Sequence, residues 1–151
     1  MRIMIATDGS DFSKFAVKKC CEIIGKPDET YVRVIAVYEQ MLPMAAEPFA
    51  VSSEYYQDIE KEIRKQCVDF SEEAAKDVRE AFPESSINVS VEVERGAPDR
   101  VIIEAAKEWN ADLIVVGSHG RGFWGRMMLG SISDSVLHHA PCSVLVVRKP
   151  T

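Results

Sequence analysis

The sequence predicts a doubly wound α/β fold, in which a five-stranded parallel sheet carries helices on both faces. Two observations support this prediction. Short apolar segments typical of buried strands alternate along the chain with longer segments whose apolar residues recur at helical spacing. The 151 residues, 46% of them hydrophobic, suffice for one core without disulfide or metal crosslinks. We see no internal repeat or linker in the sequence, so residues 1–151 are expected to form a single domain.

The chain is expected to begin with a strand and a helix. Residues 3–7 are apolar and are followed by the turn sequence 8–10, which is typical of a strand buried on both faces. Apolar residues at helical spacing then predict a helix over about 11–24, started by Ser10 or Asp11 and ended by Gly25.

A long helix is expected between the next two strands. Residues 31–38 form an apolar run rich in β-branched residues, and prolines and small residues make 39–53 a long loop. Charged residues with an apolar one at every third or fourth position predict an amphipathic helix over 54–81, which ends before Pro83. Apolar and polar residues alternate strictly over 87–94, so this strand is expected to lie at a sheet edge with one solvated face.

The last third of the chain is expected to complete the alternation. A helix begins at Pro98 and is closed by Asn110, and residues 113–116 form a fully apolar strand. A glycine-rich segment then leads to a short helix over 131–139 and a last strand over 144–147. Because strands alternate with helices, the crossovers should be right-handed and the sheet mostly parallel.

The charge of the chain is negative overall but uneven. With 18 basic and 24 acidic residues the formal net charge is −6, which argues against nucleic acid as a partner. Residues 113–151 differ, because they hold four basic residues and one acidic residue. We therefore expect an anion-binding site in the last quarter of the chain.

The cysteines and the short apolar runs predict a cytoplasmic protein. The four cysteines include no CxxC pair and have no histidine at metal-ligand spacing, so we expect reduced thiols that pack in the core and no metal site. The apolar run 3–6 is too short for a signal peptide or a membrane span.

The segment 117–131 is expected to carry the chemistry. It contains five glycines, two arginines and one histidine but no acidic residue. Glycines let backbone N–H groups converge on an anion, and the N-terminus of the following helix adds free N–H groups. Phosphate binding is the natural hypothesis. Ser131 keeps two interpretations, as a hydroxyl that donates to a phosphate or only as the N-cap of the helix.

Two familiar phosphate motifs do not fit this segment. The loop of nucleotide triphosphatases requires a lysine, and none follows these glycines. Gly120-Arg-Gly-Phe-Trp-Gly125 matches the dinucleotide pattern GxGxxG literally. That fingerprint also needs an acidic residue about 20 positions further on, where this chain has Arg148 and Lys149. We interpret the match as coincidental.

The spacing of the glycines resembles a family motif. Gly117-x2-Gly120-x9-Gly130-Ser131 is similar to the G-2x-G-9x-G-[S/T] motif of the ATP-binding branch of the universal stress protein family. The opening segment 3–10, the turn 95–98, the segment 111–121 and the ending 139–147 resemble the same family, so the resemblance covers the whole chain. It implies a Rossmann-like sheet of order 3-2-1-4-5, with ATP bound across the carboxyl ends of strands 1 and 4.

The resemblance also implies roles for individual residues. Residues after the first strand would border the adenosine, Val37 would hydrogen-bond adenine through its backbone, and the later glycines would surround the phosphates. ATP is the expected ligand, with AMP or ADP as alternatives and Mg2+ or Mn2+ as the accompanying ion. The expected cofactor-binding residues are Ala6, Thr7, Asp8, Val37, Val116, Gly117, Ser118, His119, Gly120, Arg121, Gly130, Ser131, Ile132 and Ser133.

Several side chains keep more than one interpretation. Asp8 either contacts the ligand or its ion, or forms the turn of an Asp-Gly-Ser sequence. His119 is expected in a loop hydrogen bond or a phosphate contact rather than in catalysis. His138 and His139 are expected as a pair at a helix C-terminus. The apolar residues within 123–129 are expected to form a packed flap or a patch for a partner.

We expect a cytoplasmic stress-response or regulatory protein in which ATP binding, rather than turnover, is the signal. The resemblance implies a homodimer that pairs strand 144–147 with its copy, and an apolar edge strand would otherwise be exposed. One alternative is a slow metal-dependent ATP hydrolase or phosphotransferase that uses Arg121, Arg126 and Ser131. Another is a nucleotide-free interaction scaffold. No catalytic residue is assigned, because no general base accompanies the glycine-rich segment.

Overall fold

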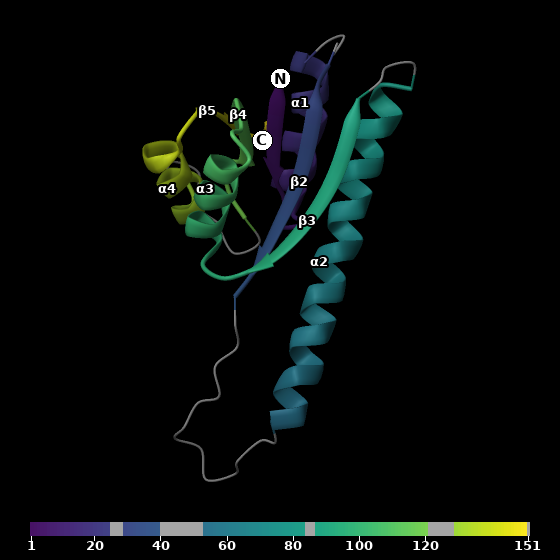
Figure 1. Cartoon of the computed structure of the whole chain (residues 1–151), viewed down its shortest axis with the longest axis vertical. Helices are drawn as coiled ribbons and strands as arrows, with labels where there is room; N and C mark the ends of the chain where they lie inside the picture. Colours follow the sequence, from purple (N-terminus) through teal and green to yellow (C-terminus); the bar gives the residue numbers. More distant parts are fainter. Residues whose placement is uncertain (25–28, 40–52, 84–86, 121–128, 151) are drawn as a thin grey trace.

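A computed structural model describes residues 1–24, 29–39, 53–83, 87–120 and 129–150. Its five strands form one parallel sheet of order β3-β2-β1-β4-β5, as Figure 1 shows. This arrangement confirms the predicted fold class and strand order. The strands are β1 (Arg2–Ala6), β2 (Tyr31–Tyr38), β3 (Asn88–Arg95), β4 (Leu113–Gly117) and β5 (Ser143–Val147), and the helices are α1 (Asp11–Ile24), α2 (Ser53–Ala81), α3 (Pro98–Glu108) and α4 (Ser131–His139).

The observed bounds lie within one or two residues of those expected. α3 ends as its sequence predicts, because Asn110 takes the left-handed conformation with φ of 54°. The N–H of Asn110 donates to the carbonyl of Lys107, and that of Ala111 donates to the carbonyl of Ala106. These two bonds form a Schellman motif, which satisfies carbonyls at the helix end. Most of the predicted loop 39–53 lies outside the described residues.

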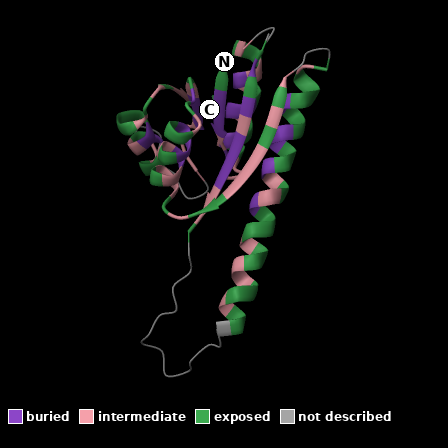
Figure 2. Ribbon diagram, viewed as in Figure 1, coloured by how far each residue is buried: buried purple, intermediate pink, exposed green. Residues whose placement is uncertain are grey.

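The sheet separates two apolar cores. Successive residues of a buried strand point to opposite faces. Ile3 and Ile5 of β1 therefore pack with α1 and α2, whereas Met4 packs with α3 and α4. Figure 1 shows these two helix pairs on opposite sides of the sheet, and Figure 2 shows that buried residues concentrate in the central strands. In the inner strand β1, Ile3, Met4 and Ile5 are all at 0% exposure.

The two edge strands are less buried than the centre. β3 pairs with β2 and alternates between exposed and half-buried residues over its first half, which confirms the predicted edge strand. β5 lies at the opposite edge, and three of its five residues are half-buried. None of the described helices is long and apolar enough to cross a membrane.

The cysteines lie in the packed part of the molecule. All four are thiols outside any disulfide, and Cys20 and Cys67 are buried. Burial, together with the neighbouring Cys21, raises the pKa of the Cys20 thiol to about 12. This thiol is therefore protonated at neutral pH, as a packing residue should be.

The order of the strands creates a crevice at their carboxyl ends. After β1 the chain turns to one face of the sheet to form α1, and after β4 it turns to the opposite face to form α4. β1 and β4 are neighbours, so the connections diverge where these strands end. A crevice of this kind is where open α/β sheets bind ligands.

Candidate functional site

A cavity of about 380 Å³ lies at the carboxyl ends of β1, β2 and β4. The first turns of α3 and α4 complete its walls, and Ser13 of α1 also lines it. Twelve of the residues predicted from the sequence are among its lining: Ala6, Thr7, Asp8, Val37, Val116, Gly117, His119, Gly120, Gly130, Ser131, Ile132 and Ser133.

The remaining predicted residues lie elsewhere. Ser118 is buried behind the wall at 1% exposure, where its hydroxyl contacts Nδ1 of His119 at 3.0 Å. Arg121 lies outside the described residues, as do Arg126 and the predicted apolar residues up to position 128.

Four lining residues were not predicted from the sequence: Ser13, Ile35, Pro98 and Ile102. Their side chains carry no distinctive chemistry, and their places follow from topology. α3 and α4 pack on the same face of the sheet, and this arrangement brings Pro98 and Ile102 of α3 to the cavity. The rule that ligands bind at the switch point could have indicated the start of α3, but no motif marks it.

One end of the cavity is apolar and includes a part of β2 that no described strand pairs with on the side of β1. Ile35, Val37 and Val116 from the sheet meet Pro98 and Ile102 from α3 there. The N–H of Thr7 donates to the carbonyl of Ile35 at 2.9 Å, so the peptide groups of Ile35 face β1. Because peptide direction alternates along a strand, those of Val37 face the same side. β1 has already ended at Ala6, so this part of β2 extends past its neighbour.

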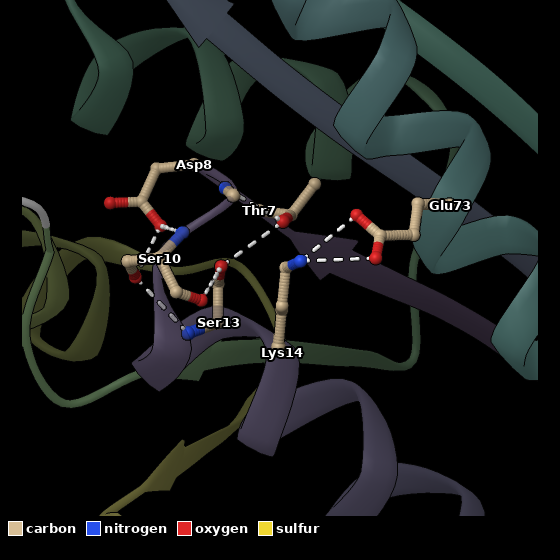
Figure 3. A network of polar contacts seen from close by, with 7 residues as sticks. Thr7, Asp8, Ser10, Ser13, Lys14 and Glu73 are labelled. Atoms are coloured by element: carbon tan, nitrogen blue, oxygen red, sulfur yellow. Dashed lines mark hydrogen bonds and ion pairs between the residues drawn. The ribbon is translucent and has the colours of Figure 1, made fainter.

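A network of polar side chains holds the turn between β1 and α1, as Figure 3 shows. Oδ1 of Asp8 accepts from the N–H of Ser10 at 3.0 Å and from its hydroxyl at 2.6 Å. The hydroxyl of Ser10 in turn accepts from the N–H of Ser13 at 3.3 Å and caps α1. Asp8 therefore forms the turn that one interpretation predicted, while it also lines the cavity. A contact of Asp8 with a ligand stays a prediction.

Buried hydroxyl groups extend this network beneath the cavity. The hydroxyl of Thr7 donates to that of Ser13 at 3.2 Å, and the latter donates to the carbonyl of Ser10 at 2.9 Å. Thr7 and Ser13 are 7% and 3% exposed. Lys14 and Glu73, also drawn in Figure 3, pair at 3.0 Å and join α1 to α2. The floor of the cavity is thus held in place by satisfied polar groups.

The other end of the cavity is the N-terminus of α4. Its N-cap is Gly130, with φ of −64° and ψ of 152°, and the cap makes no side-chain hydrogen bond. The interpretation of Ser131 as the N-cap is therefore wrong, because the helix begins at Ser131 itself. In an α-helix the N–H groups of the first residues have no partner within the helix. Those of Ser131, Ile132 and Ser133 thus point out of α4 at the cavity, beside the exposed hydroxyl of Ser131.

Ser118 anchors the start of α4. Its carbonyl accepts from the N–H of Gly130 at 2.9 Å and from the hydroxyl of Ser133 at 3.1 Å. The hydroxyl of Ser133 also contacts the carbonyl of Gly130 at 2.9 Å. These contacts fix the helix N-terminus against the end of β4.

The three motif glycines differ in what surrounds them. A Cβ on Gly117 would lie 2.9 Å from the carbonyl carbon of Phe12, in the backbone of α1. A Cβ on Gly120 would lie 2.9 Å from Oδ2 of Asp8. A Cβ on Gly130 would meet nothing closer than 3.5 Å. Packing therefore requires a glycine at position 117, whereas neither packing nor backbone conformation requires one at position 130.

The histidines occupy the kinds of position expected. His119 makes the loop contact with Ser118, and its ring lies 5.2 Å from that of Phe12. Nδ1 of His138 lies 2.8 Å from the carbonyl of Asp134, and Nδ1 of His139 lies 2.9 Å from that of Ser135, both at the C-terminal end of α4. Within the part of the chain that the structure describes, no three His, Cys, Asp or Glu side chains are grouped as metal ligands.

The fold and the cavity define a doubly wound α/β protein with a ligand-sized site at the switch point of its sheet. The model of the universal stress protein family matches residues 1–148 of the chain. The chain belongs to the universal stress protein family, which confirms the predicted family. Universal stress protein MJ0531 of Methanocaldococcus jannaschii is 35% identical over 150 residues, which cover 99% of this chain and 82% of that protein.

Solved structures share the fold. The structure of hypothetical protein MJ0577 matches with a TM-score of 0.82 at 20% identity and covers 99% of this chain and 96% of its own. An Arabidopsis thaliana universal stress protein family member with AMP bound matches with a TM-score of 0.59 at 20% identity, over 100% and 93% of the chains. A universal stress protein in complex with cAMP matches with a TM-score of 0.57 at 22% identity, over 97% and 96%.

Proposed function

We propose that this chain is a cytoplasmic regulatory protein of the stress response that binds an adenine nucleotide, ATP above all, in the cavity at the switch point. The observation that carries the proposal is that one cavity has an apolar end and an end with hydrogen-bond donors. An apolar slot with an open strand edge lies at one end, and the N-terminus of α4 lies at the other beside Gly130. AMP in the Arabidopsis thaliana protein and cAMP in the second relative support an adenine ligand in this fold.

The apolar end suits the base. The carbonyl of Val37 can accept from the amino group of adenine, and its N–H can donate to a ring nitrogen. Guanine presents the opposite pattern, with an acceptor where adenine has its amino group. Pro98, Ile102 and Val116 supply apolar surface for the flat faces of the ring.

We therefore expect ATP to bind more tightly than GTP. Binding guanine leaves a buried acceptor unpaired, which costs about 1–3 kcal/mol and corresponds to roughly ten- to hundredfold in affinity. Isothermal titration calorimetry with each nucleotide in the presence of Mg2+ measures this ratio. Equal affinities would contradict base recognition by the strand edge, and the absence of ATP binding would contradict the proposed function.

The end at α4 suits the phosphates. Its free N–H groups and the positive end of the helix dipole favour an anion, and Ser131 adds a hydroxyl donor. Gly130 has no structural reason to be a glycine in the protein alone, but it leaves room for phosphate oxygens to approach the helix. We propose that Mg2+ or Mn2+ accompanies the phosphates. We also propose that Arg121, which is not among the described residues, contacts them.

We also propose that the protein acts as a homodimer, with nucleotide occupancy as its signal. In the part of the chain that the structure describes, β5 pairs with β4 alone, and its other edge supports this proposal. The N–H of Ser118 donates to the carbonyl of Val147, so the peptide groups of Val147 face β4. By alternation those of Val144 and Val146 face away from the sheet, where a second copy of β5 can pair with them.

Replacing Val146 with proline is expected to separate the dimer and to preserve the fold. The substitution removes an N–H that points away from the sheet. An edge strand tolerates this loss, but a second copy of β5 needs the N–H for pairing. Sedimentation velocity should show a monomer where the wild type is a dimer. Leu145→Pro is the matched control, because its N–H faces β4 and its loss should unfold the protein. A Val146→Pro protein that remained dimeric would contradict pairing through β5.

A further inference from the structure

A hydrogen bond joins the two helices that form facing walls of the cavity. The hydroxyl of Ser135 in α4 donates to Oδ2 of Asp99 in α3 at 2.8 Å. Asp99 directly follows Pro98, which lines the cavity, and Ser135 lies one helical turn beyond Ser131, which lines it from the other side. The bond therefore links the first turn of α3 to the second turn of α4, next to the residues that line the cavity.

Asp99 accepts hydrogen bonds at the start of α3. The hydroxyl of Ser135 and backbone N–H groups at the start of α3 lower the pKa of Asp99 below its ordinary value. The carboxylate is thus ionised at neutral pH, and hydrogen bonds to an ionised acceptor are about twice as strong as those between neutral groups. Both residues are half-buried, which limits competition from water.

The two helices also pack directly on each other, and Ile102 of α3 and Val136 of α4 belong to the same buried apolar cluster. α4 is tied to the end of β4 through the carbonyl of Ser118. α3 is held on the sheet by Ile102, which is 4% exposed in the core between α3 and the strands. Each helix is thus anchored to the sheet, and the Ser135–Asp99 bond adds a directional polar contact to the apolar packing between them.

We propose that Asp99 and Ser135 are positioning residues, which set the spacing of α3 and α4 across the cavity and thereby its affinity for the nucleoside. This inference rests on the proposed nucleotide function. Pro98 and Ile102 of α3 line the end assigned to the base, so a shift of α3 alters contacts to adenosine rather than to phosphate. The loss of the bond should therefore affect ATP and adenosine by the same factor.

Calorimetric titration with ATP and with adenosine tests this inference on the wild type, Ser135→Ala, Asp99→Ala and the double variant. We expect each single substitution to weaken both ligands about three- to tenfold, and the double variant to bind no more weakly than either single variant. Ser135→Thr keeps the hydroxyl and should bind nearly as the wild type does. This rescue separates the hydrogen bond from a general effect of substitution in α4.

Two outcomes would overturn the inference and are distinct from each other. If Ser135→Ala lowered the melting temperature but left both affinities unchanged, the bond would contribute to stability alone. If the affinity for ATP fell while the affinity for adenosine did not, Asp99 and Ser135 would act on the phosphate end of the cavity instead. A wild-type protein that bound neither ligand would contradict the proposed function itself, and the inference would fall with it.

Discussion

A Gly117→Ala protein is expected to lose much of its stability. The end of β4 packs directly on the first turn of α1, and a Cβ at this position would lie 2.9 Å from the carbonyl carbon of Phe12, 3.0 Å from its oxygen and 3.1 Å from the nitrogen of Ser13. All three are backbone atoms, so no side chain can rotate away. Overpacking of this kind typically costs 1–3 kcal/mol and occasionally more, so we expect a loss of at least about 2 kcal/mol.

Urea unfolding of the variant and the wild type measures this loss. Gly130→Ala is the matched control, because its Cβ meets only ordinary contacts at 3.5 Å or more and should leave the free energy of unfolding nearly unchanged. An unchanged unfolding free energy for Gly117→Ala would show that α1 and β4 can move apart at little cost. The packing reason for this glycine would then be wrong.

Replacing Gly130 with valine should have the opposite outcome, with the fold kept and phosphate binding lost. The backbone of Gly130, at φ of −64° and ψ of 152°, suits any residue. A Cβ there would make ordinary contacts with the backbone of Ser118 and His119 and with the hydroxyl of Ser133. Because Gly130 lines the cavity, we expect the methyl groups of valine to fill part of it. They would occupy the space that the proposed site leaves for phosphate oxygens at the N-terminus of α4.

We expect Gly130→Val to lower the affinity for ATP about ten- to hundredfold, because one or two charge-assisted hydrogen bonds of about 1.5–3 kcal/mol each are lost. Adenosine, which lacks phosphates, should bind as it does to the wild type. Thermal unfolding and sedimentation should show a stable dimer. If the variant lost stability and binding together, Gly130 would be a structural residue and the phosphate end would be assigned wrongly.

The order of elements could be predicted because each segment has a clear period. The strict alternation over 87–94 predicted the edge position of β3, and the continuous apolar run at 3–7 predicted a strand buried on both faces, as β1 is. Asn110 marked the end of α3 because asparagine tolerates the left-handed conformation that it adopts. These signals are local, so they are visible without the fold.

The parts of the site that could not be predicted from the sequence depend on contacts between distant segments. Ser135 and Asp99 are 36 positions apart, and neither belongs to a motif. Gly117 and Gly130 look equivalent in the sequence, yet the packing of α1 on β4 gives the first a structural role that the second lacks. Gly130 rather than Ser131 is the N-cap because its carbonyl accepts the first helical hydrogen bond, from the N–H of Asp134.

The most direct test of nucleotide binding is the identity of the small molecule that accompanies the protein. The chain is purified without added nucleotide and denatured, and the released molecule is identified by chromatography and mass spectrometry. We expect ATP, or AMP or ADP, near one per chain, and intact ATP after hours with Mg2+ or Mn2+ before denaturation. Steady conversion of ATP to ADP would contradict a function by binding alone. No released nucleotide, together with no binding of added ATP, would contradict the nucleotide site itself.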